Sequence, residues 1–284
     1  MPDRRPTADT SDPRSLLNSI RAWRIAAVLM VLGPVALPAH ASPYVLHYDA
    51  AWGGALAGEV ILSLDDDSGQ FRNSIEIRSV GIARWLTSFR AHAESTGVWD
   101  HDRPTPARYE AVYDLRKRRD KQLQVRFQRL GPAFVADTSI PILPERTRLA
   151  EALRRDVVDP LSALTSVRAM AREGRLNPGD RHVVHVFDGK RRFDVEVIVG
   201  DRETITAADA PIDALNLSLR LHPVTLIKTE RDDQDDVERE AELWVTADER
   251  ALPLRLVLDI AYAPLVISVN DECEQPGSCA TIHR

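Results

Sequence analysis

Hydrophobic and polar residues alternate along most of this 284-residue chain. In the segment 71–78, Phe71, Asn73, Ile75 and Ile77 occupy every second position, and polar or charged residues fill the positions between. The same period of two recurs over the segments 109–115, 122–128, 193–199, 215–221 and 254–260. Because successive side chains of a strand point to opposite faces, this pattern predicts antiparallel strands with one buried and one solvated face.

A short segment in the first third of the chain follows a helical period instead. Ile82, Trp85, Leu86 and Phe89 are spaced i, i+3, i+4 and i+7, which is typical of an amphipathic helix. Three of them, Trp85, Leu86 and Phe89, are candidate gate residues for a ligand cavity. The alternative is that they plug the sheet, since aromatic stripes at helical spacing usually belong to the core.

A second helix is predicted from Pro160, with Leu161, Leu164, Val167 and Met170 along its apolar face. Asp159 is suited to cap this helix, and proline is favoured at the first helical position. The helix separates two stretches of alternating sequence, so it interrupts the sheet.

A sheet of ten or more strands with one apolar face must curl on itself or be covered by helices. We therefore expect a mainly β protein: a large curled antiparallel meander, forming an open or partly closed barrel, with two short helices. Residues 42–270 are expected to form this single domain.

The N-terminal segment 1–41 reads as a polar extension followed by a secretory signal peptide. Residues 25–37 form an apolar run, Arg21 and Arg24 precede it, and residues 39–41 (Ala-His-Ala) fit a signal peptidase site. We expect cleavage between Ala41 and Ser42 and export to the periplasm. The run is too short for a bilayer span, which needs about 20 apolar residues.

The charge of the chain argues against nucleic acid as a partner. The formal net charge is −6, and removal of residues 1–41, with five basic and three acidic side chains, makes it more negative. Binding to phosphate backbones requires positive surface. No second apolar stretch approaches membrane length, so no transmembrane segment is predicted in the mature chain.

The chain has two cysteines, Cys273 and Cys279, both in the C-terminal tail 271–284. In an oxidising compartment, two nearby cysteines usually pair, so we expect a local disulfide; free thiols are the alternative. A metal site would need more ligands than these cysteines and His283 provide.

Candidate catalytic and metal-binding residues give weak signals. His182 and His185 lie three apart on a predicted strand, so their side chains point to opposite faces and cannot share one ion; His182 is expected in solvent and His185 in the core. Ser162 lacks the glycines of a nucleophile elbow. We predict no catalytic residues, metal or cofactor, and expect a protein that is not an enzyme.

Several short motifs together resemble one family, the periplasmic domain-of-unknown-function family numbered 3108. They are Ala57-Gly58, Ser95-x-Gly97, residues 159–164 (Asp-Pro-Leu-Ser-Ala-Leu) with Arg168, residues 187–190 (Phe-Asp-Gly-Lys), and Trp244 with Asp248 and Leu252-Pro253. The resemblance extends from Tyr44 to about Val269. It implies an exported β-rich protein without an established reaction.

The expected architecture is also similar, by fold analogy only, to the periplasmic lipoprotein carriers, in which a curled sheet and short helices enclose an apolar cavity. The leading hypothesis is a non-enzymatic periplasmic envelope protein that binds lipid or another apolar ligand in such a cavity. A scaffolding protein with a packed interior that acts through its surface is one alternative, and an envelope hydrolase is another.

Overall fold

A computed structural model of the chain describes residues 43–66, 69–101, 103–115, 118–141, 148–224, 238–260 and 262–273. The expected cleavage site after Ala41 and Cys279 lie outside these residues, as does the side chain of Cys273. The last strand continues to Cys273, three residues past the domain end expected at 270. No helix in these ranges is both long and apolar enough to cross a membrane.

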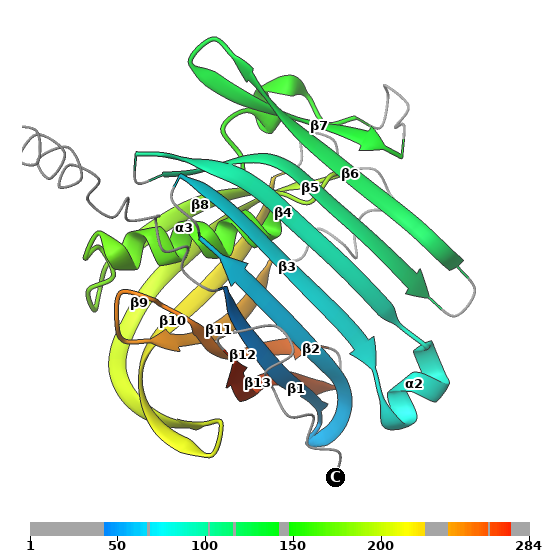
Figure 1. Cartoon of the computed structure of the whole chain (residues 1–284), viewed down its shortest axis with the longest axis vertical. Helices are drawn as coiled ribbons and strands as arrows, with labels where there is room; N and C mark the ends of the chain where they lie inside the picture. Colours follow the sequence, from blue (N-terminus) through cyan, green and yellow to red (C-terminus); the bar gives the residue numbers. More distant parts are fainter. Residues whose placement is uncertain are drawn as a thin grey trace, which may run out of the picture. The chain divides into compact units, whose positions relative to one another are not determined.

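The described residues form one antiparallel sheet of thirteen strands (Figure 1). The strands are β1 (Tyr44–Trp52), β2 (Ala55–Asp65), β3 (Gln70–Ser79), β4 (Arg90–Asp100), β5 (Arg103–Leu115), β6 (Arg118–Leu130), β7 (Ala133–Ile140), β8 (Arg181–Phe187), β9 (Arg192–Ala207), β10 (Ala210–Val224), β11 (Arg239–Thr246), β12 (Pro253–Ile260) and β13 (Ala263–Cys273). They are ordered β7-β6-β5-β4-β3-β2-β1-β13-β12-β11-β10-β9-β8. Strands adjacent in sequence pair with each other, except β7 and β8, and the pairing of β1 with β13 places the first and last strands in the middle of the sheet.

The two edge strands, β7 and β8, are joined by the segment 155–158. Arg155 bridges to Val135 of β7, and Val158 bridges to Val186 of β8. The Val158 amide donates to the His185 carbonyl, and the Phe187 amide donates back to the Val158 carbonyl, both at 2.8 Å. Because this segment supplies the hydrogen bonds that edge strands lack, the sheet is nearly closed into a barrel. The predicted curled antiparallel meander is confirmed.

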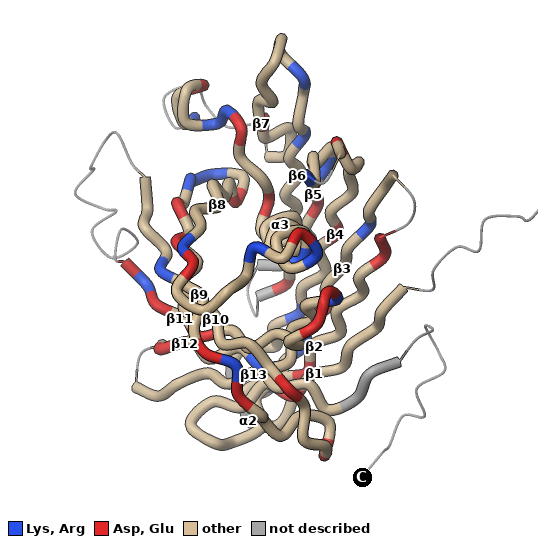
Figure 2. Tube along the Cα trace, turned by 90° about the vertical axis from the view of Figure 1, so that its left-hand side faces the viewer, with Lys and Arg blue, Asp and Glu red and all other residues tan. Residues whose placement is uncertain are grey.

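The helix α3 (Pro160–Arg172) lies inside the ring of strands, and Figure 2 shows it nearly end-on. On one side Leu161 packs in a core formed mainly by β1–β6; on another, Val167 packs with β8–β11. The preceding residues 151–154 form a short 3-10 helix, Glu151–Arg154. A helix enclosed by strands on several sides is buried around most of its circumference, and this explains the polar contacts of α3 described below.

The other helix, α2 (Gly81–Thr87), lies outside the ring, where it follows β3 and packs against β2 (Figure 1). Phe89 falls beyond the end of α2 and is half-buried. Trp85 is 75% exposed, and the side chain of Leu86 is outside the described residues. In this structure, therefore, the Trp85 indole is not packed in the core.

Candidate functional site

The inner face of the sheet is organised in rows of side chains that run across the strands. One row is polar, because Asn73 of β3, Ser95 of β4 and Tyr109 of β5 are register partners. Asn73 and Ser95 are fully buried. The helix α3 lies over this row, and Asn73 Nδ2 donates to Thr165 Oγ1 of α3 at 2.5 Å.

Asp159 caps α3 and also joins the helix to the sheet. Its Oδ1 accepts the amides of Leu161 and Ser162, both at 3.0 Å. Its Oδ2 accepts the hydroxyls of Ser162 at 2.6 Å and Ser95 at 2.8 Å. Burial raises the pKa of the Asp159 carboxyl, although these four hydrogen bonds oppose the shift. Burial, with the nearby Asp159 and Asp188 carboxylates, also raises the pKa of the Tyr109 phenol.

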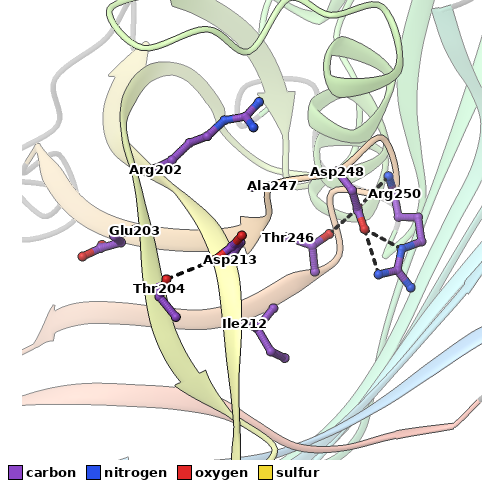
Figure 3. A pocket seen from close by; sticks show the side chains of 9 residues that line it. All are labelled: Arg202, Glu203, Thr204, Ile212, Asp213, Thr246, Ala247, Asp248 and Arg250. Atoms are coloured by element: carbon purple, nitrogen blue, oxygen red, sulfur yellow. Dashed lines mark hydrogen bonds and ion pairs between the residues drawn. The ribbon is translucent and has the colours of Figure 1, made fainter.

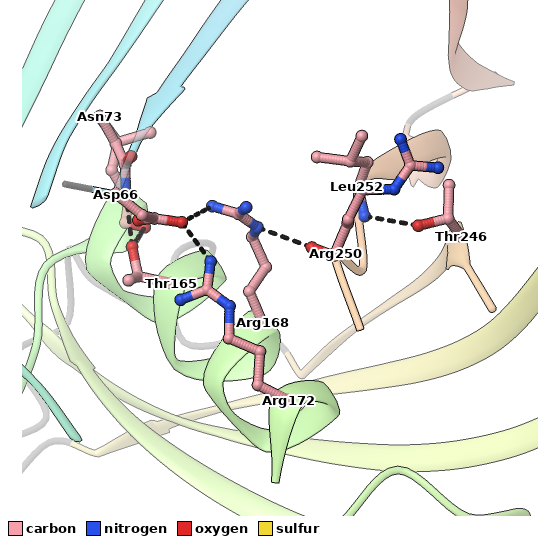
Figure 4. Close-up of polar contacts among 9 residues, drawn as sticks. Asp66, Asn73, Thr165, Arg168, Arg172, Thr246, Arg250 and Leu252 are labelled. Carbon is pink, nitrogen blue, oxygen red and sulfur yellow. Dashed lines mark hydrogen bonds and ion pairs between the residues drawn. The ribbon is translucent and has the colours of Figure 1, made fainter. Parts of the chain in front are cut away.

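A second polar group of α3 centres on Arg168, whose side chain is fully buried (Figure 4). Its guanidinium pairs with the carboxylate of Asp66, which follows β2, and its Nε donates to the Arg250 carbonyl at 2.9 Å. Arg172 adds a second contact to Asp66 at 2.6 Å. The charge pair therefore ties α3 to the end of β2 and to the turn between β11 and β12.

Three buried atoms around this group have no hydrogen-bond partner among the described residues: Asp66 Oδ1, Asn73 Oδ1 and Arg168 Nη2. They are two acceptors and one donor, a combination that ordered water commonly satisfies in protein interiors. Asp159, Ser95 and Ser162 are fully buried, so neither the Asp159 carboxyl nor the two serine hydroxyls can meet a substrate in this conformation. The contacts of Asp159 and Arg168 therefore hold α3 in position, and the serines beside Asp159 are not exposed as nucleophiles.

Below the polar row, the inner face becomes apolar. One row consists of Ile75, Ala93, Ala111 and Leu123, and the next consists of Ile77, Ala91 and Tyr113. Ile75, Ile77, Ala91, Ala111 and Leu123 are only partly buried, and Tyr113 is exposed. This set of residues, which we call the lower apolar rows, is an incompletely covered part of the inner face.

Residues from the other half of the sheet pack against the same core. They are Ile205 of β9, Ile212 of β10 and Ile267 of β13, all partly buried. The tip of the β9–β10 hairpin reaches β13, where the Ala208 amide donates to the Val269 carbonyl at 3.2 Å. Ile205, Ile212 and Ile267 therefore pack against the same apolar core as Ile75, Ile77, Ala111 and Leu123.

A pocket of about 580 Å³ lies at the junction of the β9–β10 hairpin and the β11–β12 turn (Figure 3). Its lining is mostly polar: Arg202, Glu203, Thr204, Ile212, Asp213, Thr246, Ala247, Asp248 and Arg250. Several of these groups form hydrogen bonds with each other: Thr204 Oγ1 donates to Asp213 at 3.0 Å, and Arg250 Nε donates to Asp248 at 2.8 Å. Its lining contains no cysteine or histidine, and each of its two threonine hydroxyls donates a hydrogen bond to an aspartate.

A second pocket of about 580 Å³ lies between two rows of the outer face of β2–β5. One row contains Glu59, Arg78, Arg90 and Asp114, and the other contains Glu76 and His92 with Ile61 and Val112. Both signs of charge alternate across it, so it selects neither anions nor cations by net charge.

The sequence-predicted residues are therefore divided between different parts of the fold. Asp159 and Pro160 lie at the start of α3 beside the polar row, whereas Trp85 and Phe89 lie in and after α2. No cluster of three or more potential metal ligands occurs in the part of the chain that is described.

The expected orientation of His185 is wrong: Val184 and Val186 face the core, while His185 Nδ1 contacts Asp194 at 2.8 Å. His182, expected in solvent, is half-buried and contacts the Arg175 carbonyl at 2.7 Å.

Sequence reasoning missed the polar partners of α3, namely Asp66, Asn73 and Ser95, and the burial of Thr165 and Arg168 within the helix. One signal was present: Asn73 occupies an inward position of an otherwise apolar alternation. A polar residue at such a position needs a buried hydrogen-bond partner.

The fold defines the class of the protein as β-barrel-like, and a solved structure supports this. It is the crystal structure of a β-barrel-like protein of the domain of unknown function DUF1849 from Brucella abortus, with 11% identity, a TM-score of 0.53, and coverage of 82% of this chain and 98% of that chain. The chain itself matches the family "Protein of unknown function (DUF3108)" over residues 47–269. The protein belongs to the DUF3108 family.

Two further comparisons add no argument about function. A putative lipoprotein from Parabacteroides distasonis is 7% identical, with 82% of this chain and 96% of that chain covered and a TM-score of 0.32. A search of curated proteins found no match.

Proposed function

We propose that this protein is a non-catalytic binding protein of the bacterial periplasm, and that its ligand is a lipid or another molecule with an acyl chain. The observation that carries the proposal is the incomplete cover of the lower apolar rows. The helix α3 covers the polar row above them, but Ile75, Ile77 and Leu123 remain partly exposed. Burying apolar side chains is favourable by about 25 cal/mol per Å², so an acyl chain along these rows would be stabilised.

The chemistry of the interior supports binding rather than catalysis. The hydroxyls of Ser95 and Ser162 are committed to Asp159 and are fully buried. A hydrolase of the usual kind needs a nucleophile and a base that can reach a substrate. The apolar run at 25–37, with its basic flank and its small residues at 39–41, supports the periplasmic part of the proposal.

Titration of the purified protein with a fluorescent fatty acid tests the proposal. Ala111 and Val112 are neighbours on β5, but Ala111 faces the interior and Val112 faces outward. Ala111→Trp should place an indole on the lower apolar rows and weaken binding by about tenfold, the equivalent of 1.4 kcal/mol. Val112→Trp is the matched control and should leave the affinity unchanged.

Native mass spectrometry of protein purified from the envelope should show bound lipid, and Ala111→Trp should reduce its occupancy. Absence of saturable fatty-acid binding by the wild-type protein would contradict the proposal and favour the scaffolding alternative. Loss of binding in Val112→Trp but not in Ala111→Trp, with unchanged melting temperatures, would place the ligand on the outer face instead.

A further inference from the structure

We propose that one end of the barrel docks on the surface of a lipid bilayer through an aromatic rim. The rim consists of five exposed apolar side chains: Trp52, Leu56, Trp85, Ile260 and Tyr262. This inference concerns the outside of the protein, so it does not depend on whether the interior binds a ligand.

The five residues come from three chain segments at the same end of the sheet. Trp52 and Leu56 flank the β1–β2 turn, Ile260 and Tyr262 belong to the β12–β13 turn, and Trp85 is on α2. The first two segments are bound together, because Trp52 Nε1 donates to the Ala263 carbonyl at 3.1 Å and the Gly53 amide to the Pro264 carbonyl at 3.2 Å. The α2 segment is bound next to them, because the Val80 amide donates to the Ala57 carbonyl at 2.9 Å.

Tyr262 lies in the two-residue turn between β12 and β13, which is closed by the register partners Ile260 and Ala263. Its φ is 75°, in the left-handed region that disfavours bulky residues, and its side chain is 99% exposed. Glycine would relieve such strain, and an exposed ring gains no stability from core packing. Two-residue hairpin turns require a positive φ, so the turn accounts for the backbone conformation, while the exposed ring is available for a contact outside the chain.

The chemistry of the rim favours a bilayer as the occupant. Tryptophan and tyrosine concentrate at membrane–water interfaces, where the ring lies among the headgroups and its polar atom stays hydrated. Two exposed arginines make no ion pair with the described residues: Arg84, adjacent to Trp85 on α2, and Arg90, five residues further on, where β4 begins between its register partners Arg78 and Asp114. Unpaired arginines next to exposed rings are complementary to the phosphate groups of lipids.

The rim lies at the end of the inner face opposite α3. From the row containing Asn73, the register runs through Ile75 and Ile77 to Ser79, which directly precedes the α2 segment. If both proposals hold, a docked rim would set the lower apolar rows toward the bilayer from which an acyl chain could be taken up.

Co-sedimentation with vesicles tests the rim, using protein purified from expressing cells and vesicles of phosphatidylcholine mixed with phosphatidylglycerol. The double variant Trp85→Ala and Tyr262→Ala should lower the partition coefficient at least about tenfold, because each ring loses its burial in the interface. The control is Val98→Ala with Leu130→Ala, two exposed apolar residues at the α3 end of the sheet. All variants are identical outside the substituted positions, so a difference between them reports the rim alone.

Replacing phosphatidylglycerol with phosphatidylcholine, and separately Arg84→Glu, should each weaken binding severalfold if the arginines contact headgroups. Equal binding by the rim and control variants would overturn the proposal. Wild-type protein that stays in the supernatant would also overturn it. A rim variant that changes only the oligomeric state in analytical ultracentrifugation would overturn it too, because a second copy of the chain would then be the occupant. Fatty-acid binding can fail without affecting this experiment, which separates the two proposals.

Discussion

The two helices carry similar apolar spacing but meet opposite environments. α3 has thirteen residues, a buried carboxylate cap and two groups of polar contacts to the sheet. α2 has seven residues and no side-chain cap, and it leaves Trp85 exposed. An isolated helix of seven residues is unstable in water, so α2 depends on its contacts with β2 and β3.

The difference shows what places a helix inside this barrel. Apolar residues at i, i+3 and i+4 occur in both helices, but only α3 also has polar side chains with partners on the inner face. A helix inside the ring buries its polar side as well as its apolar side, and those polar groups must be satisfied there. The hydrogen bonds of Asp159 and Thr165 and the ion pair of Arg168 meet this requirement.

The largest expected effect comes from removing the buried charge of α3. Arg168→Met should destabilise the protein by about 3–5 kcal/mol, because Asp66 is left buried with a weaker set of partners. Arg84→Met in α2 is the matched substitution at an exposed position and should change stability by less than about 0.5 kcal/mol. Urea unfolding followed by circular dichroism measures both. Similar midpoints for the two variants would show that the Arg168 contacts do not anchor α3.

The strands were predictable because their signal is local. The alternation over 71–78, 109–115 and 215–221 corresponds to β3, β5 and β10, and the start of α3 follows from Asp159 and Pro160. The closing segment 155–158 was not predictable, since it has no periodic pattern and is defined only by the two edges that it joins. The burial of Arg168 was not predictable for a related reason. The sequence alone predicts that the polar side of an amphipathic helix faces solvent, and only the surrounding strands bury it here.

Two glycines of the family motifs show that the resemblance rests partly on packing. A side chain at Gly97 would collide with the Phe71 ring and the Thr105 carbonyl, and one at Gly189 would collide with Leu123. The motif residues Asp159 and Ser95 bind each other across the interior. Gly97, Gly189 and the hydrogen bond between Ser95 and Asp159 therefore contribute to the packing of the fold.

The next effect compares an apolar residue of each helix. Leu161→Ala should cost about 2–5 kcal/mol, because Leu161 is buried in the core beside β1–β6. Trp85→Ala removes a larger side chain but should cost less than about 0.5 kcal/mol, since the indole is mostly exposed. Thermal unfolding of both variants checks this order. A Trp85→Ala variant as unstable as Leu161→Ala would mean that α2 plugs the sheet in solution.

The smallest effect concerns the pH dependence of the α3 cap. Burial raises the pKa of Asp159 in the folded protein, so its carboxyl holds a proton more tightly there than in the unfolded chain, where the ordinary value is 3.8. The stability contributed by this group is then complete below about pH 4 and is lost as the pH rises through the folded pKa. The amide in Asp159→Asn does not titrate, and the other carboxyls titrate in both proteins. The melting temperature of the wild type minus that of Asp159→Asn should therefore fall as the pH is raised from 4 to 7, by a few degrees or less. A difference that grows over this range would mean that the hydrogen bonds from Ser95, Ser162 and the two helix amides outweigh burial, and that the cap works as a carboxylate throughout.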